Sequence, residues 1–228
     1  MVISMDDHHR LVRLLHLVSP TLPTGAYSYS QGLEWAVESG WIHDHQSLHS
    51  WLSELARLSM ASVDIPLIAR MYKALAGSSS DKLEQWCDLL LACRETAELR
   101  DEEQIRGRAM ATLLQGLALG RVEVFYPLLA KSQLAGIALA AVEWEIPLQD
   151  TALGYTWSWL ENQVLAGMKI IPLGQTEGQQ MLLKMTDLVV DTVQRGLMLK
   201  DCEIGAAAPG LALASCFHEI QYTRLYRS

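Results

Sequence analysis

Apolar residues recur at intervals of three and four along most of this chain, and that periodicity constrains the fold more than any other feature. The spacing places apolar side chains on one face of a helix, and it is clearest over 11–18, 48–62 and 181–193. No Asn-Gly or Asp-Gly pair separates two alternating runs, so no β-hairpin is predicted. We find no internal repeat and no long linker. We therefore expect residues 1–228 to form one compact all-α domain of about eight to ten helices.

Capping signals and gaps in the periodicity predict several helix boundaries. Asp64 is expected to cap the helix that follows it. Residues 120–127 carry no helical pattern and are expected to be irregular, ahead of an Ala-rich helix from 128 to about 144. A Thr and a Gln with capping-box spacing predict one helix over 176–193.

Composition and charge exclude several classes of protein. A formal net charge of -8 argues against nucleic acid, because phosphate backbones are bound by clustered Lys and Arg. The four cysteines form no CxxC pair, which is typical of reduced thiols in a cytosol. The N-terminal stretch lacks the basic region of a signal peptide, and the longest apolar run, 134–142, is half a membrane span. We expect a cytoplasmic protein that binds neither nucleic acid nor membrane.

Motifs of catalytic chemistry are missing from the sequence. There is no P-loop, no GxGxxG after a strand and no GxSxG nucleophile elbow. The stretch HEIQY fails as half of a zinc-protease motif, since Tyr222 stands where the second histidine would be. We expect no catalytic residues and no cofactor.

Three histidines form the best candidate metal site. His45 and His49 lie one helical turn apart, and with His43 they could hold nickel or zinc. The alternative is a polar loop and first helical turn in which the histidines are solvated. We expect no tight metal site.

Acidic residues gather at 95–103 and, in a second group, at Glu34 and Glu38. Either group could supply general acids or bases, but catalysis needs a pair that converges on a cleft. The arginines interleaved with the first group predict an exposed, salt-bridged helix face instead.

Aromatic residues point to binding. Seven Trp and seven Tyr stand against two Phe, and amphipathic rings are favoured at interfaces. Tyr27 follows two prolines, Pro20 and Pro23, which restrict the loop and reduce the entropy lost when a partner docks. The alternative for Tyr27 is a ring folded onto its own helix.

Four blocks of sequence resemble one known family. LLHLVSPTLPTGAYSYSQGLEWAVESGWI is similar to the N-terminal signature of the urease accessory protein UreF family. LLACRETAELRDEEQIRG, LENQVLAGMKIIPLGQTEGQ and HEIQYTRLYRS resemble three further family blocks, in family order and up to residue 228. One departure is Ile220, where threonine is commoner in the family.

The resemblance implies a role without chemistry of its own. Members of the family are all-helical homodimers that bind the accessory protein UreD, called UreH in some organisms. Together they recruit the GTPase UreG, regulate its use of GTP and assist nickel delivery to the urease apoprotein. For the homodimer we expect an interface on the helix around 134–142, whose small residues allow close packing.

The resemblance also carries over partner-binding residues. Tyr27 and Arg224 are implied in UreG recruitment, and Lys169 in the surface that gates GTP use. The C-terminal block adds His218, Glu219 and Tyr222. Since residues 221–228 offer little to bury, we expect a flexible tail that orders when UreD binds. A small-molecule enzyme or metal carrier built on the Glu or His clusters remains the alternative function.

Overall fold

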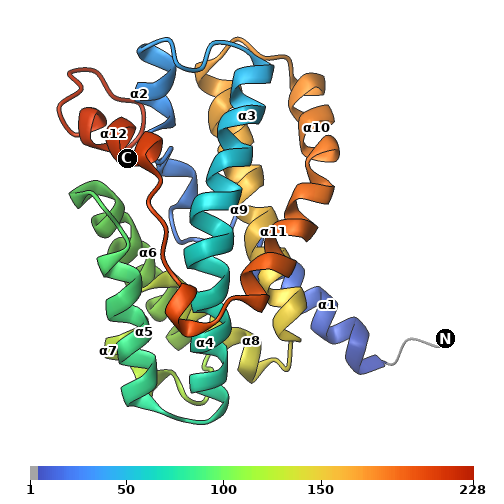
Figure 1. The fold of residues 1–228 in the computed structure, drawn as a ribbon. Coiled ribbons are helices and arrows are strands. Elements are labelled where there is room, and N and C mark those ends of the chain that lie inside the picture. The colour runs from blue at the N-terminus through green and yellow to red at the C-terminus, as the bar shows by residue number, and fades with distance from the viewer. Residues whose placement is uncertain (1–4) are drawn as a thin grey trace.

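The computed structural model describes residues 5–228, and the structural statements below refer to that part of the chain. The first four residues, which belong to the stretch searched for a signal peptide, lie outside it. Residues 5–228 contain α-helices, two 3-10 turns and one π-helical segment, with no strand, in one compact body (Figure 1). The all-α prediction is confirmed.

The helices follow one another with short connections. They are α1 (Met5–Leu17), α2 (Leu33–Glu38), α3 (His45–Leu55), α4 (Ile65–Ala76), α5 (Ser80–Ala92), α6 (Ala97–Gly116), α7 (Val122–Leu129), α8 (Gln133–Glu143), α9 (Leu148–Ile170), α10 (Gln175–Lys184), α11 (Thr186–Met198) and α12 (Pro209–His218). The 3-10 turns are η1 (Ala26–Ser28) and η3 (Asp201–Glu203), and the π-helical segment is η2 (Ala56–Asp64).

Twelve α-helices in the described residues exceed the eight to ten expected. One reason is that the chain breaks at Met185, which divides the helix expected over 176–193 into α10 and α11. The capping box expected from Thr176 and Gln179 is also wrong, because α10 already begins at Gln175. The backbone N–H of the preceding Gly174 donates to Glu177 Oε2 at 2.9 Å.

Asp64 does not cap a new helix. The segment η2 joins α3 to α4 in one continuous rod, so no helix start exists there (Figure 1). The carboxylate is buried, and it accepts hydrogen bonds from Arg94 Nη1 at 2.9 Å and from the Tyr155 hydroxyl at 2.8 Å. Asp64 therefore links helices in the interior.

Residues 120–127 are not irregular, because α7 covers most of them. Pro127 lies inside α7, and the N–H that it lacks would have bonded the carbonyl of Glu123, an exposed residue that water can reach. The break comes later, at 130–132, where Ser132 Oγ accepts from the Leu134 N–H at 3.0 Å and starts α8. The predicted helix 128–144 is thus two helices.

Helix α8 lies inside the fold, packed against α4 and α6. Every residue over 133–141 is buried. The close approach needs Gly136, since a Cβ there would collide with Met110 of α6. The expected dimer interface on this helix is therefore wrong, because its small residues pack within one chain.

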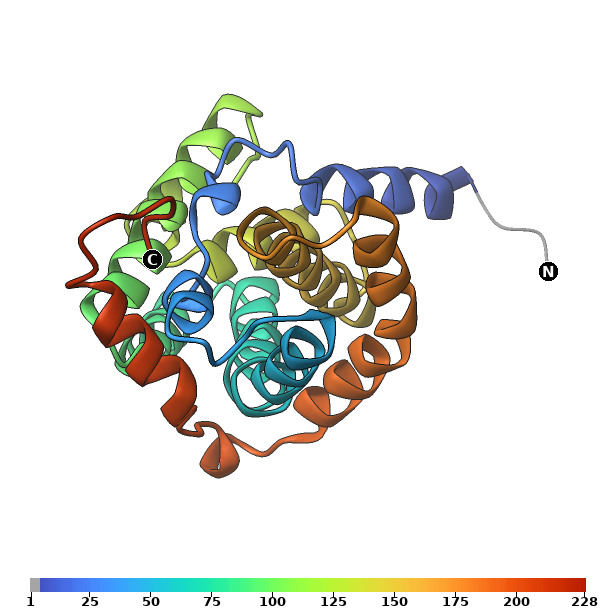
Figure 2. The same cartoon turned by 90° about the horizontal axis from the view of Figure 1, so that it is seen from above.

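The C-terminal part of the chain returns to the start of the fold. Seen from above, α10 and α11 run around the outside of α9, and α12 lies beside α2 and α6 (Figure 2). Helix α1 instead extends away from the body (Figure 2). Among residues 5–228, no helix combines the length and apolar composition that a bilayer span requires.

Candidate partner-binding surface

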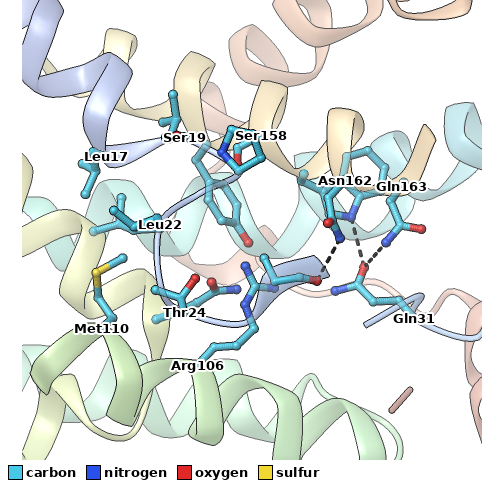
Figure 3. Close-up of a pocket in the computed structure, with 17 residues that line it drawn as sticks. Leu17, Ser19, Leu22, Thr24, Gln31, Arg106, Met110, Ser158, Asn162 and Gln163 are labelled. Carbon is cyan, nitrogen blue, oxygen red and sulfur yellow. Dashed lines mark hydrogen bonds between the residues drawn. The ribbon is translucent and has the colours of Figure 1, made fainter. Parts of the chain in front are cut away.

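The signature loop, residues 19–31, connects α1 to α2 and presents one tyrosine. Tyr29 is buried, whereas Tyr27 in η1 is 65% exposed. Asn162 of α9, labelled in Figure 3, holds the turn between them. Its Nδ2 donates to the carbonyl oxygens of Ala26 at 3.1 Å and Tyr29 at 3.4 Å. The Tyr27 ring does not fold onto its own helix, so it is available to a partner.

Gln31 ties the end of this loop to two helices. Its φ of 54° is unusual for a residue with a side chain, and such a conformation is held by its surroundings. The Gln31 amide accepts from Trp159 Nε1 at 3.0 Å (Figure 3). It also donates to Glu102 Oε1 at 3.1 Å. The loop is therefore fixed to α9 and to α6.

A small cavity of about 50 Å³ lies beneath the loop (Figure 3). Arg106 Nε and Gln163 Oε1 are buried without a protein partner among the described residues, and both side chains line the cavity. Its volume and polarity suit a few ordered water molecules.

Helix α2 makes a close backbone contact with α12. Gly32 precedes α2 with a φ of 77°, and a Cβ there would lie 2.9 Å from the backbone nitrogen of Ser215. Both the conformation and the space require glycine. Ser215 Oγ lies 2.7 Å from Oγ1 of Thr96, the residue that caps α6. Helices α2, α6 and α12 therefore meet at one place.

The last residues of the chain pair with the signature loop. The Arg227 N–H donates to the carbonyl of Ser28 at 2.8 Å, and the Ser30 N–H donates to the carbonyl of Ser228 at 2.8 Å. Ser30 Oγ donates to the same Ser228 oxygen at 2.6 Å. Tyr226 and Ser228 are buried, so the expectation that this segment has little to bury is wrong. The flexibility predicted for 221–228 stays a prediction, and these contacts restrict it to residues 221–224.

Glu34 of α2 holds the C-terminal segment by its backbone. Its Oε1 accepts from the Leu225 N–H at 2.7 Å, and its Oε2 accepts from the Tyr226 N–H at 2.9 Å. Since the Glu34 side chain is buried, these bonds replace the water that its charge would otherwise need. Glu34 was a candidate acid or base, and its contacts show a structural role.

His218 lies between two carboxylates. Its ring is fully buried, with Nδ1 2.8 Å from Glu98 Oε2 and Nε2 3.3 Å from Glu34 Oε2. Each ring nitrogen therefore has a carboxylate of another helix within hydrogen-bonding distance. We call Glu34, Glu98 and His218 the tail clasp. The expected partner contact of His218 is not possible in this conformation, because neighbouring side chains cover the ring.

Three other residues of the C-terminal block reach the surface. Arg224 is 41% exposed, and its Nη1 donates to Glu98 Oε1 at 2.8 Å. Glu219 is exposed and accepts from the backbone N–H of Glu98 at 3.2 Å, in the first turn of α6. Tyr222 is fully exposed. The tail clasp therefore supports a surface on which Arg224 keeps free guanidinium donors.

Lys169 lies apart from the C-terminal segment, at the exposed end of α9. It follows Asn162 by seven residues, which places both on one helix face about 10 Å apart along the axis. Because Asn162 holds the signature loop, Lys169 lies on the same side of α9 as that loop.

The acidic stretch at 95–103 is not the exposed face that its arginines suggested. Glu102 and Glu103 are buried, and Arg94 pairs with Asp64 Oδ1 and Glu103 Oε2, each at 2.9 Å. Burial would lower the pKa of Arg94, but Asp64 and Glu103 outweigh it and raise the pKa well above its ordinary value. This pairing fixes the break between α5 and α6, and thus the position of Glu98.

The histidines considered as metal ligands belong to a capped helix start. His43, His45 and His49 are exposed, and Asp44 caps α3 by accepting from the Ser47 N–H at 2.8 Å. Hydrogen bonds from Ser47 lower the pKa of Asp44. Within residues 5–228, no three His, Cys, Asp or Glu side chains are grouped so that they could hold a metal ion.

The fold and this surface define an all-helical protein in which an exposed loop tyrosine and the C-terminal segment are joined. The model of the UreF family matches residues 42–186. The urease accessory protein UreF of Pseudomonas putida strain W619 is 46% identical over 224 residues, which cover 98% of this chain and 100% of that protein. UreF of Alcanivorax borkumensis is 46% identical over 222 residues, covering 95% and 97%. UreF of Citrobacter koseri is 41% identical over 224 residues, covering 98% and 100%. The chain belongs to the UreF family of urease accessory proteins, which confirms the resemblance.

The residues that hold the surface together are not apparent from the sequence. Glu34, Glu98 and Asn162 were not among the expected partner-binding residues, although all three lie in blocks that resemble the family. Glu34 stands four residues after Ser30, and both bind the C-terminal segment. No periodicity pairs residue 34 with residue 226, so only the fold could bring them together.

Proposed function

We propose that this chain is a non-enzymatic assembly factor that works as a cytoplasmic homodimer during maturation of urease. In this account it binds UreD, and the two together recruit the GTPase UreG and regulate its use of GTP. The assembly then assists nickel delivery to the urease apoprotein. Membership of the UreF family is the starting point of the proposal, and the partners come from the family resemblance.

One observation carries the recruitment step. The hydrogen bond from the Arg227 N–H to the Ser28 carbonyl joins the segment that holds Arg224 to the loop that holds Tyr27. Both side chains are exposed, and each stands close in sequence to a residue of that bond. A partner could therefore contact both at once.

The two side chains suit a protein partner. Tyrosine and arginine are the residue types that most often contribute strongly to protein interfaces. Arg224 uses one guanidinium nitrogen on Glu98, so its other donors can bind a carboxylate of UreG. Tyr222 and Glu219 are exposed in the same C-terminal block, and we assign them to the same partner-binding surface.

The C-terminal segment supports a role for UreD in ordering the surface. Its last residues, from Leu225 on, are hydrogen-bonded to α2 and the signature loop, whereas 222–224 are exposed. We assign these residues the flexibility predicted from the sequence. Contact with UreD would fix them and thereby fix Arg224.

Co-purification with UreD and UreG tests the proposal. Tagged full-length protein is mixed with purified UreD and UreG, and we expect it to retain both. The variant Arg224→Ala should keep UreD and lose UreG. Arg195→Ala is the control, since it also removes an exposed arginine, one that pairs with Asp191 within α11. A protein that retains neither partner would favour the enzyme or metal-carrier alternative.

A further inference from the structure

A groove lies along the pair of helices α4 and α5, which are side by side and joined by a short turn over 77–79 (Figure 1). It has a volume of about 800 Å³ and ends at η3, where Asp201 and Cys202 line it. The turn between α4 and α5 lies at the end of the body opposite α2 and α12 (Figure 1). The groove is therefore separate from the candidate partner-binding surface.

Arg70 of α4 closes the groove at η3. Its Nε donates to Asp201 Oδ1 at 2.9 Å, and its Nη2 donates to the carbonyl of Leu199. The Arg70 side chain is mostly buried, and its charge is matched by that of Asp201. This pair fixes η3 against α4 and leaves no net charge in the groove.

Two lysines give the groove its positive charge. Lys73 lies on the α4 wall and Lys82 on the α5 wall, and both are exposed. Within residues 5–228 the ion pairs of lysine belong to Lys131, which binds Glu84 and Asp88. Lys73 and Lys82 therefore stand unpaired, one on each side of the groove.

The acidic residues of α5 lie on another face of that helix. Glu84 and Asp88 are held by Lys131 at 2.9 and 3.0 Å, and Asp81 precedes Glu84 by three residues on the same face. Lys82 and Trp86, four residues apart, lie on the face that lines the groove. The carboxylates of α5 thus leave the charge of the groove uncancelled.

The floor of the groove is apolar. Ala74 is buried, and the half-buried Trp86 and Leu89 pack on the main core cluster while they also line the groove. An apolar floor between two cationic walls is the pattern that an amphipathic helix recognises when its apolar stripe is flanked by carboxylates. A small anion would leave this floor uncovered.

The charge of the whole chain favours the same kind of partner. The formal net charge is -8, so most of the surface repels an acidic segment, whereas the unpaired charges of this groove attract it. Opposite charge at a single groove in an acidic protein gives both attraction and register.

We infer that the groove between α4 and α5 binds an acidic amphipathic helix of a partner protein. The apolar stripe of that helix covers Trp86 and Leu89, and its carboxylates meet Lys73 and Lys82. From Lys82 to Leu89 the groove follows α5 for about 10 Å, which corresponds to about two turns of a bound helix. The inference does not depend on the proposed function, because Tyr27 and the tail clasp take no part in it.

Fluorescence anisotropy of a labelled synthetic peptide tests the groove. The probe is a helix of about 16 residues with leucines on one face and glutamates on both flanks, titrated with the full-length protein. We expect saturable binding with a dissociation constant below about 100 μM. The double variant Lys73→Glu, Lys82→Glu should raise that constant about tenfold or more, whereas Gln85→Lys, which adds a cation to the groove, should lower it. Lys184→Glu with Arg195→Glu is the matched control, since it makes the same change of charge at exposed positions of α10 and α11.

Matched peptides separate the groove from general charge attraction. The same helix with lysine in place of glutamate should not bind, and a scrambled peptide of identical composition should bind about tenfold more weakly or worse. Circular dichroism of the Lys73→Glu, Lys82→Glu protein should match that of the wild type, because both lysines face solvent. Absence of saturable binding, equal binding of the scrambled peptide, or binding that the double variant leaves unchanged would each overturn the inference. Binding of pyrophosphate at these lysines without binding of the peptide would also overturn it, in favour of a small-anion site.

Discussion

The backbone N–H of Arg227 donates a hydrogen bond to the carbonyl oxygen of Ser28 at 2.8 Å, across nearly the whole length of the sequence. Through this bond the C-terminal segment lies against the signature loop, and Ser228 binds the next residues of the loop in the same way. Two blocks that resemble the family at opposite ends of the chain thus form one surface.

Replacing Glu34 should release the C-terminal segment. Glu34→Ala removes the acceptor of the Leu225 and Tyr226 N–H groups, and we expect a loss of about 2–4 kcal/mol in the free energy of unfolding. Hydrogen exchange should show faster exchange of these two amides, with the amides of α8 unchanged. Glu54→Ala, an exposed glutamate on α3, is the control. Unchanged protection of Tyr226 would contradict the role given to Glu34.

His218→Leu should lower the free energy of unfolding by more than the similar volume of the two side chains suggests. The leucine leaves Glu34 and Glu98 close together and buried, without the ring that lies between them. Removing one partner so that a buried polar group is left without its hydrogen bond typically costs about 1–3 kcal/mol, and more when that group is charged. Urea unfolding measures the loss. His218→Gln keeps a hydrogen-bond donor and should lose less, and equal losses for the two variants would argue that packing alone matters at this position.

The cap of α3 should make stability depend on pH in one direction. The hydrogen bonds from Ser47 lower the pKa of Asp44 below its ordinary value of 3.8, so the native state favours the carboxylate. This stabilisation is present above that ordinary value and is lost as the pH falls through the lower native pKa. The melting temperature of Asp44→Ala should therefore lie below that of the wild type at neutral pH, and the two should converge in acid. Asp101→Ala, which removes an exposed aspartate in α6, should show no such convergence.

Lys169→Ala should separate binding from regulation. The side chain is exposed at the end of α9 and supports no described element, so the variant should fold and bind UreD as the wild type does. In the assembled complex, GTP hydrolysis by UreG should change. Lys184→Ala, another exposed lysine near the end of a helix, is the control. If the variant and the wild-type complexes hydrolyse GTP equally at equal occupancy by UreG, the Lys169 side chain only covers its apolar neighbours.

The helical fold was predictable because local periodicity reports it. The spacing at 11–18 and 48–62 corresponds to α1 and to α3 with η2. Boundaries were less predictable, since a cap signal such as Asp64 can be used instead in a buried ion pair. The length of α7 could not be read from its sequence, because Pro127 is tolerated where the unpaired carbonyl faces water.

The candidate surface was predictable only in part. The resemblance to the family pointed to Tyr27 and Arg224, and both are exposed. It did not indicate that His218 is covered, because a histidine in a short polar motif looks the same whether it is solvated or held between carboxylates. Long-range contacts such as Glu34 with Tyr226 depend on the packing of α2 against α12, which no local pattern encodes.

The affinity of UreG for the preassembled complex of this protein with UreD tests the central claim most directly. We predict that Tyr27→Ala and Arg224→Ala each raise the dissociation constant for UreG ~10-fold or more, while UreD stays bound and circular dichroism is unchanged. Arg195→Ala should bind UreG as the wild type does. If UreG binds both the Tyr27 and the Arg224 variant with wild-type affinity, the joined loop and C-terminal segment do not recruit it.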